Sequence, residues 1–382
     1  MEVEARLTRP GAVYLAGEGV EVEVTVRRSE QARDSGRLAW CSLQLHCQRQ
    51  LNFHRVRLPE AAASDDALQG NNTSFLPNRG EHGEMVFSSK PLILFCDLEL
   101  RPGQRKVFRH TEPLPAEDLP PSFRGHAVKY LYKLTLGVQD LNAPVRLLRI
   151  PFRVLVLSGL SLVCLDDQSL RPANPFLESG GRQASILDIA TQIIDNITAI
   201  ANRQVYKVTT GRGQVCTLSL QRNSFKLGDE VVVGLDFSSG SVPCVQLCAS
   251  LQMLEEISEE CRVGRESAES LATTAAKRHI VTLCVKNTQI KLPIPLTATP
   301  TFFTNIVHLK WRIHFEFVTS DNEHLANEAV EDGSTWEAPG SVEIETMVWD
   351  LPIKVFPANP LFACLGSNIQ PAEAKSKLSI SL

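Results

Sequence analysis

Segments in which apolar and polar residues strictly alternate recur along the chain. In residues 20–26 four valines alternate with two glutamates and a threonine, and in residues 231–237 apolar residues again occupy every second position. A period of two is typical of a β-strand with one face buried and the other in solvent. Gly, Pro and Asn turns separate these segments, so the pattern predicts an all-β protein.

The alternating segments belong to an internal repeat. An aromatic residue, a glycine and an acid in residues 14–18 precede the first segment, and the same three residue types recur in residues 225–229, 211 positions later. A Pro-Ser-Phe run at 121–123 and a Pro-Thr-Phe run at 300–302 lie 179 positions apart. A repeat of this length indicates two copies of one structural unit.

Two further landmarks close each unit. Pro151 and Pro352 stand in matching apolar segments, where a proline suggests the start or the edge of a strand. Pro-Ala-Asn-Pro occurs at 172–175 and again at 357–360, and we expect it to mark the exit from each unit as a turn that is incompatible with a helix.

We therefore expect two tandem antiparallel β-sandwich domains, residues 1–165 and 206–362, joined by a linker at 166–205. The offset between matching landmarks falls from 211 residues to 179, so the first domain contains about thirty residues that the second lacks. The Gly-, Asn- and Ala-rich stretch 59–91 is predicted to be this insertion and to be mobile. The polar segment 363–382 is predicted to be a mobile tail.

One segment of the linker has a helical period instead. Residues 185–203 predict an amphipathic helix, with Ser185 and Asp188 in the positions of an N-terminal capping box. Its apolar stripe must be covered, either between the two sandwiches or by another chain, and the spacing does not choose between these alternatives. The stripe consists of Ile186, Ile189, Ile193, Ile194, Ile197 and Ile200. The candidate interdomain or partner contacts are Ile186, Ile189, Ile193, Ile197 and Ile200.

The composition excludes several classes of chemistry. A net charge of -4 argues against a nucleic-acid partner. None of the ten cysteines forms a CxxC pair, and no HExxH or phosphate-binding loop occurs, so we expect no metal, no cofactor and no catalytic residues. Cys244 and Cys248 are interpreted as small buried thiols. The acidic pairs 166–167 and 255–256 are interpreted as solvated turn or strand-end charges.

The chain has no segment with the length of a bilayer span. The most hydrophobic window, residues 154–165, is well short of the ~20 residues required, and the N-terminus lacks the basic flank and apolar core of a secretory signal. Any membrane association is therefore expected to be peripheral.

These landmarks resemble the arrestin-like fold, above all the run Pro120, Pro121, Ser122 and Phe123 ahead of the strand with Tyr130 and Tyr132. More closely, the isoleucine helix between the sandwiches, the doubled Pro-Ala-Asn-Pro and the closing residues 355–357 resemble the Rgp subunit of the Ric and Rgp complex. The similarity extends over nearly the whole chain.

The resemblance implies a protein of retrograde endosome-to-Golgi transport, in the cytoplasm and on the cytosolic face of Golgi membranes. It implies pairing with a large propeller-containing Ric subunit to form a guanine-nucleotide exchange factor for the Golgi Rab-six GTPase. Nucleotide exchange requires differential affinity for two states of the GTPase and no covalent chemistry. This chain is then expected to be a non-catalytic scaffold.

Two other functions stay open. One is a cargo adaptor of the arrestin or retromer type that binds sorting peptides of transmembrane proteins by strand addition, although no PPxY motif or acidic tail supports receptor binding. The other is a cysteine hydrolase, because the partners of a Cys–His site need to be near each other only in space.

Overall fold

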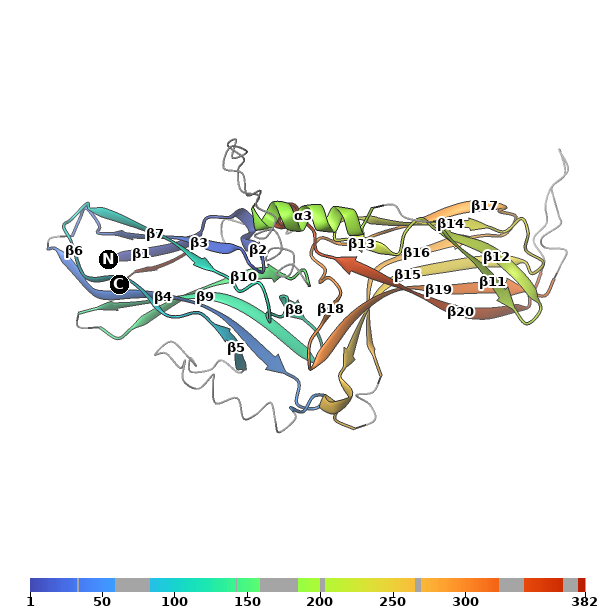
Figure 1. Ribbon diagram of the computed structural model, residues 1–382, viewed down its shortest axis with the longest axis horizontal. Helices are drawn as coiled ribbons and strands as arrows, with labels where there is room; N and C mark the ends of the chain where they lie inside the picture. Colours follow the sequence, from blue (N-terminus) through green and yellow to red (C-terminus); the bar gives the residue numbers. More distant parts are fainter. Residues whose placement is uncertain are drawn as a thin grey trace, which may run out of the picture.

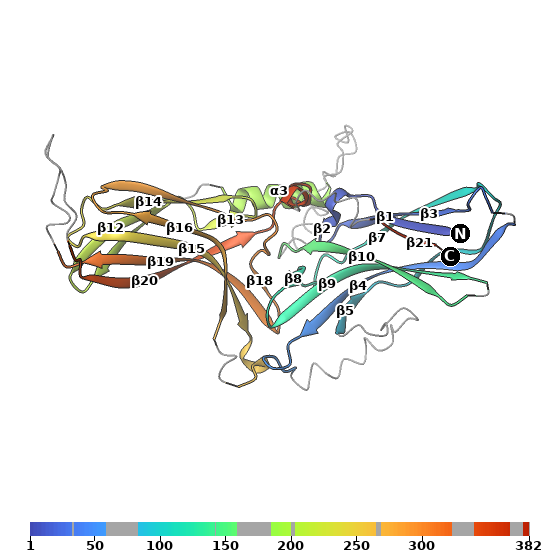
Figure 2. The same cartoon turned by 180° about the vertical axis from the view of Figure 1, so that it is seen from behind.

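The computed structural model describes residues 1–32, 34–58, 83–141, 143–158, 185–199, 203–264, 269–322, 340–366 and 377–381. Two β-sandwiches lie end to end, and helix α3 (Ile186–Ile197) runs along the junction between them (Figure 1). The all-β, two-domain prediction is confirmed. The first strand, β1 (Glu2–Leu7), and the last, β21 (Lys377–Ser381), pair side by side in the first sandwich (Figure 2).

The first sandwich consists of two sheets. The smaller has the strand order β21-β1-β3-β7, and the larger has the order β2-β10-β9-β4-β5, with β6 also paired to β4 and β8 to β9. The bounds are β1 (Glu2–Leu7), β2 (Val13–Leu15), β3 (Gly19–Arg27), β4 (Gly36–Leu51), β5 (Glu84–Ser88), β6 (Leu92–Leu100), β7 (Arg105–Pro113), β8 (Phe123–Arg124), β9 (Val128–Asp140), β10 (Arg146–Leu155) and β21 (Lys377–Ser381).

The second sandwich repeats this plan. Its sheets have the orders β11-β12-β14-β17 and β13-β20-β19-β15-β16, with β18 paired to β19. The bounds are β11 (Gln204–Thr210), β12 (Gly213–Leu220), β13 (Ser224–Lys226), β14 (Glu230–Asp236), β15 (Cys244–Ile257), β16 (Leu271–Val281), β17 (Asn287–Pro293), β18 (Phe302–Phe303), β19 (Val307–Ser320) and β20 (Ile344–Phe356).

The repeated landmarks of the sequence lie on equivalent strands of the two sandwiches. The alternating segments 20–26 and 231–237 lie on β3 and β14, each of which is the third strand of its four-stranded sheet. The short strands β2 and β13 pair in parallel with the ends of β10 and β20. Pro151 and Pro352 precede these parallel pairings, so each stands where its strand has a neighbour on one side.

The Pro-Ser-Phe and Pro-Thr-Phe runs have a shared structural role. The Ser122 hydroxyl accepts a hydrogen bond from the amide of Val154 at 2.8 Å, and the Thr301 hydroxyl accepts one from the amide of Val355 at 3.1 Å. The Ser122 and Thr301 amides each donate back to the carbonyl of the same partner. In both units a hydroxyl residue therefore holds the run that precedes the short strand against the last long strand of the large sheet.

Three predictions about irregular segments require correction. Residues 84–88 of the expected insertion form β5, which pairs with β4; residues 59–82 lie outside the described part. The expected mobile tail contains β21, whose Leu378 and Ile380 pack on the first core while Ser379 faces outward. This alternation over five residues was too short to stand out in the sequence.

The third correction concerns the second Pro-Ala-Asn-Pro, which begins a short helix. Asn359 is the N-cap of α5 (Pro360–Ala363), its side chain accepts a hydrogen bond from the amide of Leu361, and Pro360 is the first helical residue. Proline is well tolerated at that position because its missing N–H would have no partner in the helix. Helix η6 (Cys364–Gly366) follows directly. Residues 172–175, the first copy, lie outside the described part.

The two hydrophobic cores extend across the domain boundary. The first core includes Ile257, Phe302 and Leu309 of the second sandwich, and the second core includes Leu15 and Leu155 of the first. Burying apolar surface in a shared core fixes the relative orientation of the sandwiches.

Candidate functional site

The repeated aromatic-glycine-acid motif forms a clasp on the face that carries α3. In the first copy, the Arg9 guanidinium lies 4.6 Å from the Tyr14 ring centroid and donates two hydrogen bonds of 2.8 Å to the Glu18 carboxylate. The same carboxylate accepts a hydrogen bond from the Leu15 amide at 2.6 Å. Gly17 has a φ of 93°, a conformation that favours glycine and permits this tight turn.

The second copy has the same construction. The Arg222 guanidinium lies 5.0 Å from the Phe225 ring centroid and donates to Asp229 at 2.8 Å, and Asp229 accepts from the Lys226 amide at 3.0 Å. Sequence reasoning found the aromatic residue and the acid of each copy but missed both arginines. The number of residues between the arginine and the aromatic residue differs by two between the copies, so the arginines do not align when the two copies are compared at one fixed offset.

Helix α3 rests on the second clasp. It begins at the predicted capping box, in which the Asp188 amide donates to the Ser185 hydroxyl and the Asp188 carboxylate accepts from the Ser185 amide. It ends at Ile197, earlier than predicted. Thr198 is its C-cap, and Arg222 donates to the Thr198 carbonyl at 2.5 Å, which satisfies a carbonyl at the end of the helix. The clasp arginine therefore fixes the end of the helix.

The helix packs within the chain, on the second core. Ile194 and Ala190 are its most buried residues, at 3% and 1% exposure, and neither is among the five candidate contacts. Of those five, Ile186, Ile189 and Ile193 are half-buried against the same core. Ile197 is 44% exposed, so it lies off the packed face, and Ile200 is outside the described residues.

Helix α5 lies beside α3 (Figure 2). Several of its apolar side chains are exposed. Asn359 donates to the Thr191 hydroxyl of α3 at 3.2 Å, while Ala363 is completely buried in the second core. Three large apolar side chains of α5 and η6 point away from this contact and are more than half exposed. We call them the α5 patch: Leu361 (54%), Phe362 (62%) and Leu365 (73%).

Glu255 joins the two sandwiches through its carboxylate. It accepts hydrogen bonds from the amides of His126, Ala127 and Val128 at 2.7, 2.9 and 3.1 Å, and it is 3% exposed. A Cβ on Gly125 would lie 2.4 Å from a carboxylate oxygen, so this approach requires glycine. The prediction that Glu255 is a solvated charge is therefore wrong, because its partners belong to a distant loop. Residues 166–167 lie outside the described part.

Two other contacts hold the same junction. The Phe123 and Phe302 rings, which are equivalent in the repeat, pack edge to face with centroids 5.1 Å apart. The Arg153 guanidinium donates to the carbonyls of Leu296 and Ala298 at 2.8 and 2.5 Å, and burial lowers its pKa to about 10.

Six of the described cysteines are buried, while Cys96 and Cys284 are exposed and Cys364 is partly exposed. Cys244 and Cys248 are buried, as predicted, and burial raises the pKa of Cys47 and of Cys216 to about 12. Cys248 lies 3.7 Å from Nε2 of His279, its cross-strand neighbour. With the thiol 3% exposed, a substrate cannot approach this pair without opening the sheet.

Within the part of the chain that the structure describes, no cluster of three or more His, Cys, Asp or Glu side chains could hold a metal ion. None of the described helices has the length and apolar character needed to cross a bilayer.

Comparison with known proteins gives a match to the Rgp1 family model over residues 20–158 and 172–320. The chain is 42% identical over 395 aligned residues to RAB6A-GEF complex partner protein 2 of Homo sapiens, covering 100% of both chains. It is 43% identical over 369 residues to the protein of the same name from Bos taurus, covering 93% of both chains. The chain belongs to the Rgp1 family.

Proposed function

We propose that this chain is a non-catalytic scaffold subunit of a two-subunit guanine-nucleotide exchange factor for a Rab6 GTPase. The full-length similarity to proteins named as partners in a RAB6A-GEF complex carries the proposal. Its partner is a large propeller-containing Ric subunit. The complex acts in retrograde endosome-to-Golgi transport, on the cytosolic face of Golgi membranes.

The junction between the sandwiches suits a scaffold. The shared cores, the three hydrogen bonds to Glu255 and the two bonds from Arg153 hold the sandwiches in one orientation. A scaffold that is rigid before binding loses less conformational entropy when it assembles.

The α5 patch is the surface that we assign to the large subunit. Leu361, Phe362 and Leu365 lie close together in sequence on an element that is anchored to the core through Ala363. Exposed apolar side chains on a fixed support are typical of a protein contact, where a few such anchors supply most of the binding energy.

The experiment is co-expression of the full-length chain with the large Ric subunit, followed by affinity capture and gel filtration. The wild-type chain should form a stoichiometric complex. Phe362→Ala should weaken the complex at least about tenfold, because truncation of an aromatic anchor commonly costs 2 kcal/mol or more. Its melting temperature should stay unchanged, since the side chain is already exposed.

Phe303→Ala is the matched control. Phe303 is 63% exposed, close to the 62% of Phe362, but it lies on β18 and packs against His308. Normal assembly of the Phe303 variant together with loss in the Phe362 variant supports the assigned surface. A wild-type chain that forms no complex with the large subunit, and instead binds the cytosolic tail of a transmembrane cargo, would contradict the proposed function in favour of an adaptor.

A further inference from the structure

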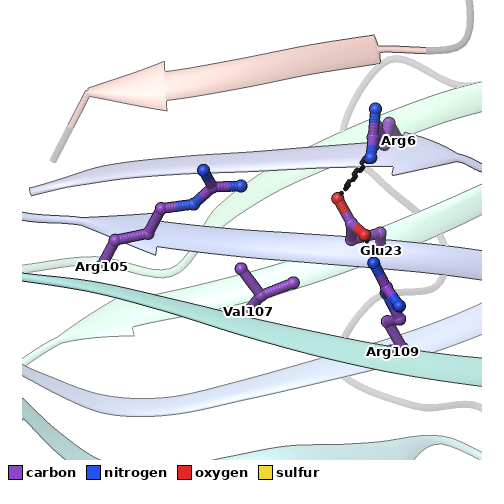
Figure 3. A pocket seen from close by; sticks show the side chains of 5 residues that line it. All are labelled: Arg6, Glu23, Arg105, Val107 and Arg109. Atoms are coloured by element: carbon purple, nitrogen blue, oxygen red, sulfur yellow. Dashed lines mark hydrogen bonds and ion pairs between the residues drawn. The ribbon is translucent and has the colours of Figure 1, made fainter.

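The outer face of the small sheet of the first sandwich has a hollow lined by Arg6, Glu23, Arg105, Val107 and Arg109, with a volume of about 450 Å³. Figure 3 shows that Arg6 on β1 and Arg109 on β7 flank Glu23 on β3, while Arg105 extends over the same face beside Val107. The residues that line the hollow thus include three guanidinium groups and one carboxylate, an excess of two positive charges.

The carboxylate occupies part of the hydrogen-bonding capacity of two arginines. Arg6 donates to one Glu23 oxygen through Nε at 3.0 Å, and Arg109 donates to the other through Nε at 2.8 Å. The Arg6 and Arg109 side chains are 51% and 71% exposed. Each guanidinium has five N–H donors, so both retain donors that face solvent.

Arg105 is the uncompensated charge. Among the described residues no carboxylate lies within ion-pair distance of it, and its cross-strand neighbour is Arg27, which pairs with Glu2 and Glu4. The two carboxylates beside Arg27 offset its charge, so the Arg105 guanidinium is the cation of this face that is left to bind an anion.

The second sandwich shows that the fold itself does not require these charges. The register that aligns Arg6, Glu23 and Arg109 across β1, β3 and β7 aligns Ser219, Gly234 and Gln289 across β12, β14 and β17. These three residues carry no charge. The same sheet position is thus neutral in one copy of the repeat and cationic in the other.

We propose that this hollow binds a phosphate group, either of a lipid headgroup or of a small soluble phosphate. Arginine presents planar, forked donors that match phosphate oxygens in bidentate geometry. The exposed Val107 forms an apolar wall against which the carbon skeleton of a phosphate ester packs. The site does not depend on the large subunit and is a separate proposal from the exchange function.

The experiment measures binding of the full-length chain to three probes: inorganic phosphate, phosphatidylcholine vesicles with or without a phosphoinositide, and a phosphoserine peptide. Arg105→Ala should weaken phosphate binding about tenfold. Arg278→Ala is the matched control, because Arg278 is an exposed arginine on β16 of the second sandwich. Glu23→Gln should strengthen binding severalfold, since it removes the carboxylate that competes for Arg6 and Arg109.

The probes separate the sources of the phosphate. Phosphoinositide-dependent vesicle binding that falls in the Arg105 variant assigns a lipid headgroup, while binding of inorganic phosphate without vesicle binding assigns a soluble ligand. The proposal is overturned if the wild-type chain binds neither inorganic phosphate nor phosphoinositide-containing vesicles, which includes the case in which the phosphopeptide alone binds. It is also overturned if the Arg105 and Arg278 variants behave alike.

Discussion

The two sandwiches follow one plan but complete their small sheets differently. In the second sandwich the outermost strand, β11, immediately precedes its neighbour β12 in the chain. In the first sandwich the same place, next to β1, is filled by β21 from the far end of the chain, through five aligned residue pairs. The first domain therefore cannot be completed from its own segment of sequence.

This difference shows how the chain becomes one structural unit. The first sandwich receives β21 at one end and, at the other, the Glu255 carboxylate and part of its core from the second sandwich. Leu15 and Leu155 of the first sandwich pack in the core of the second. Cooperative unfolding of the whole chain is the expected consequence, because neither domain keeps all its contacts alone.

The largest effect should come from Glu255→Ala. It leaves the amides of His126, Ala127 and Val128 without their acceptor, the last two of them buried, and we expect the free energy of unfolding to fall by about 3 kcal/mol. Because the lost contacts join the sandwiches, the single thermal transition should split into two, as measured by calorimetry.

Glu256→Ala, one position along the same strand, is the control. Glu256 is partly exposed and pairs with Lys310 at 2.6 Å, so its loss should cost less than about 1 kcal/mol and leave one transition. Equal effects of the two variants would mean that the junction is not held through Glu255.

Ile380→Asp should have the next largest effect, confined to the first sandwich. A carboxylate in place of this half-buried side chain would detach β21, at a cost of about 2 kcal/mol. Hydrogen exchange should become faster at the amides of β1 and stay unchanged at those of β12. Ser379→Asn changes the adjacent, outward-facing residue without placing a charge opposite Glu4, and it should leave both sets protected. Protection of β1 in the Ile380 variant would show that β21 contributes nothing to this edge.

The smallest effect concerns Glu23, whose counterpart in the second sandwich is Gly234. Hydrogen bonds from Arg109 and Arg6 lower the pKa of Glu23 against the opposing effect of burial. The resulting stability, about 1 kcal/mol, is present above the ordinary glutamate pKa and is lost as pH falls through the lower folded value. Denaturation of the wild-type chain and of Glu23→Gln should therefore differ at neutral pH and converge in acid. A difference that grows in acid would contradict this assignment.

The sequence predicted the features that depend on local pattern. Strand periodicity located β3 and β14, and the spacing of isoleucines with the Ser185–Asp188 box located the start of α3. These signals are readable because each is produced by neighbours along the chain.

The features that it did not predict depend on partners distant in sequence. Glu255 is buried because a loop 127 to 129 residues away covers it, and Arg9 and Arg222 act through rings and carboxylates that only the folded turn brings near them. The α5 patch lies where the sequence indicated the start of a polar tail. Which of its side chains are exposed depends on the contacts of α5 with α3 and with the second core, and these contacts are not local in sequence.

The central claim is that this chain acts as a scaffold within an exchange complex. It is tested most directly by measuring release of a fluorescent guanine nucleotide from a Rab6 GTPase in the presence of the chain alone, the large subunit alone and the two together. We predict a release rate near the spontaneous rate with the chain alone and a large increase with the assembled complex. Full stimulation by the isolated chain, or none by the complex, would contradict the account.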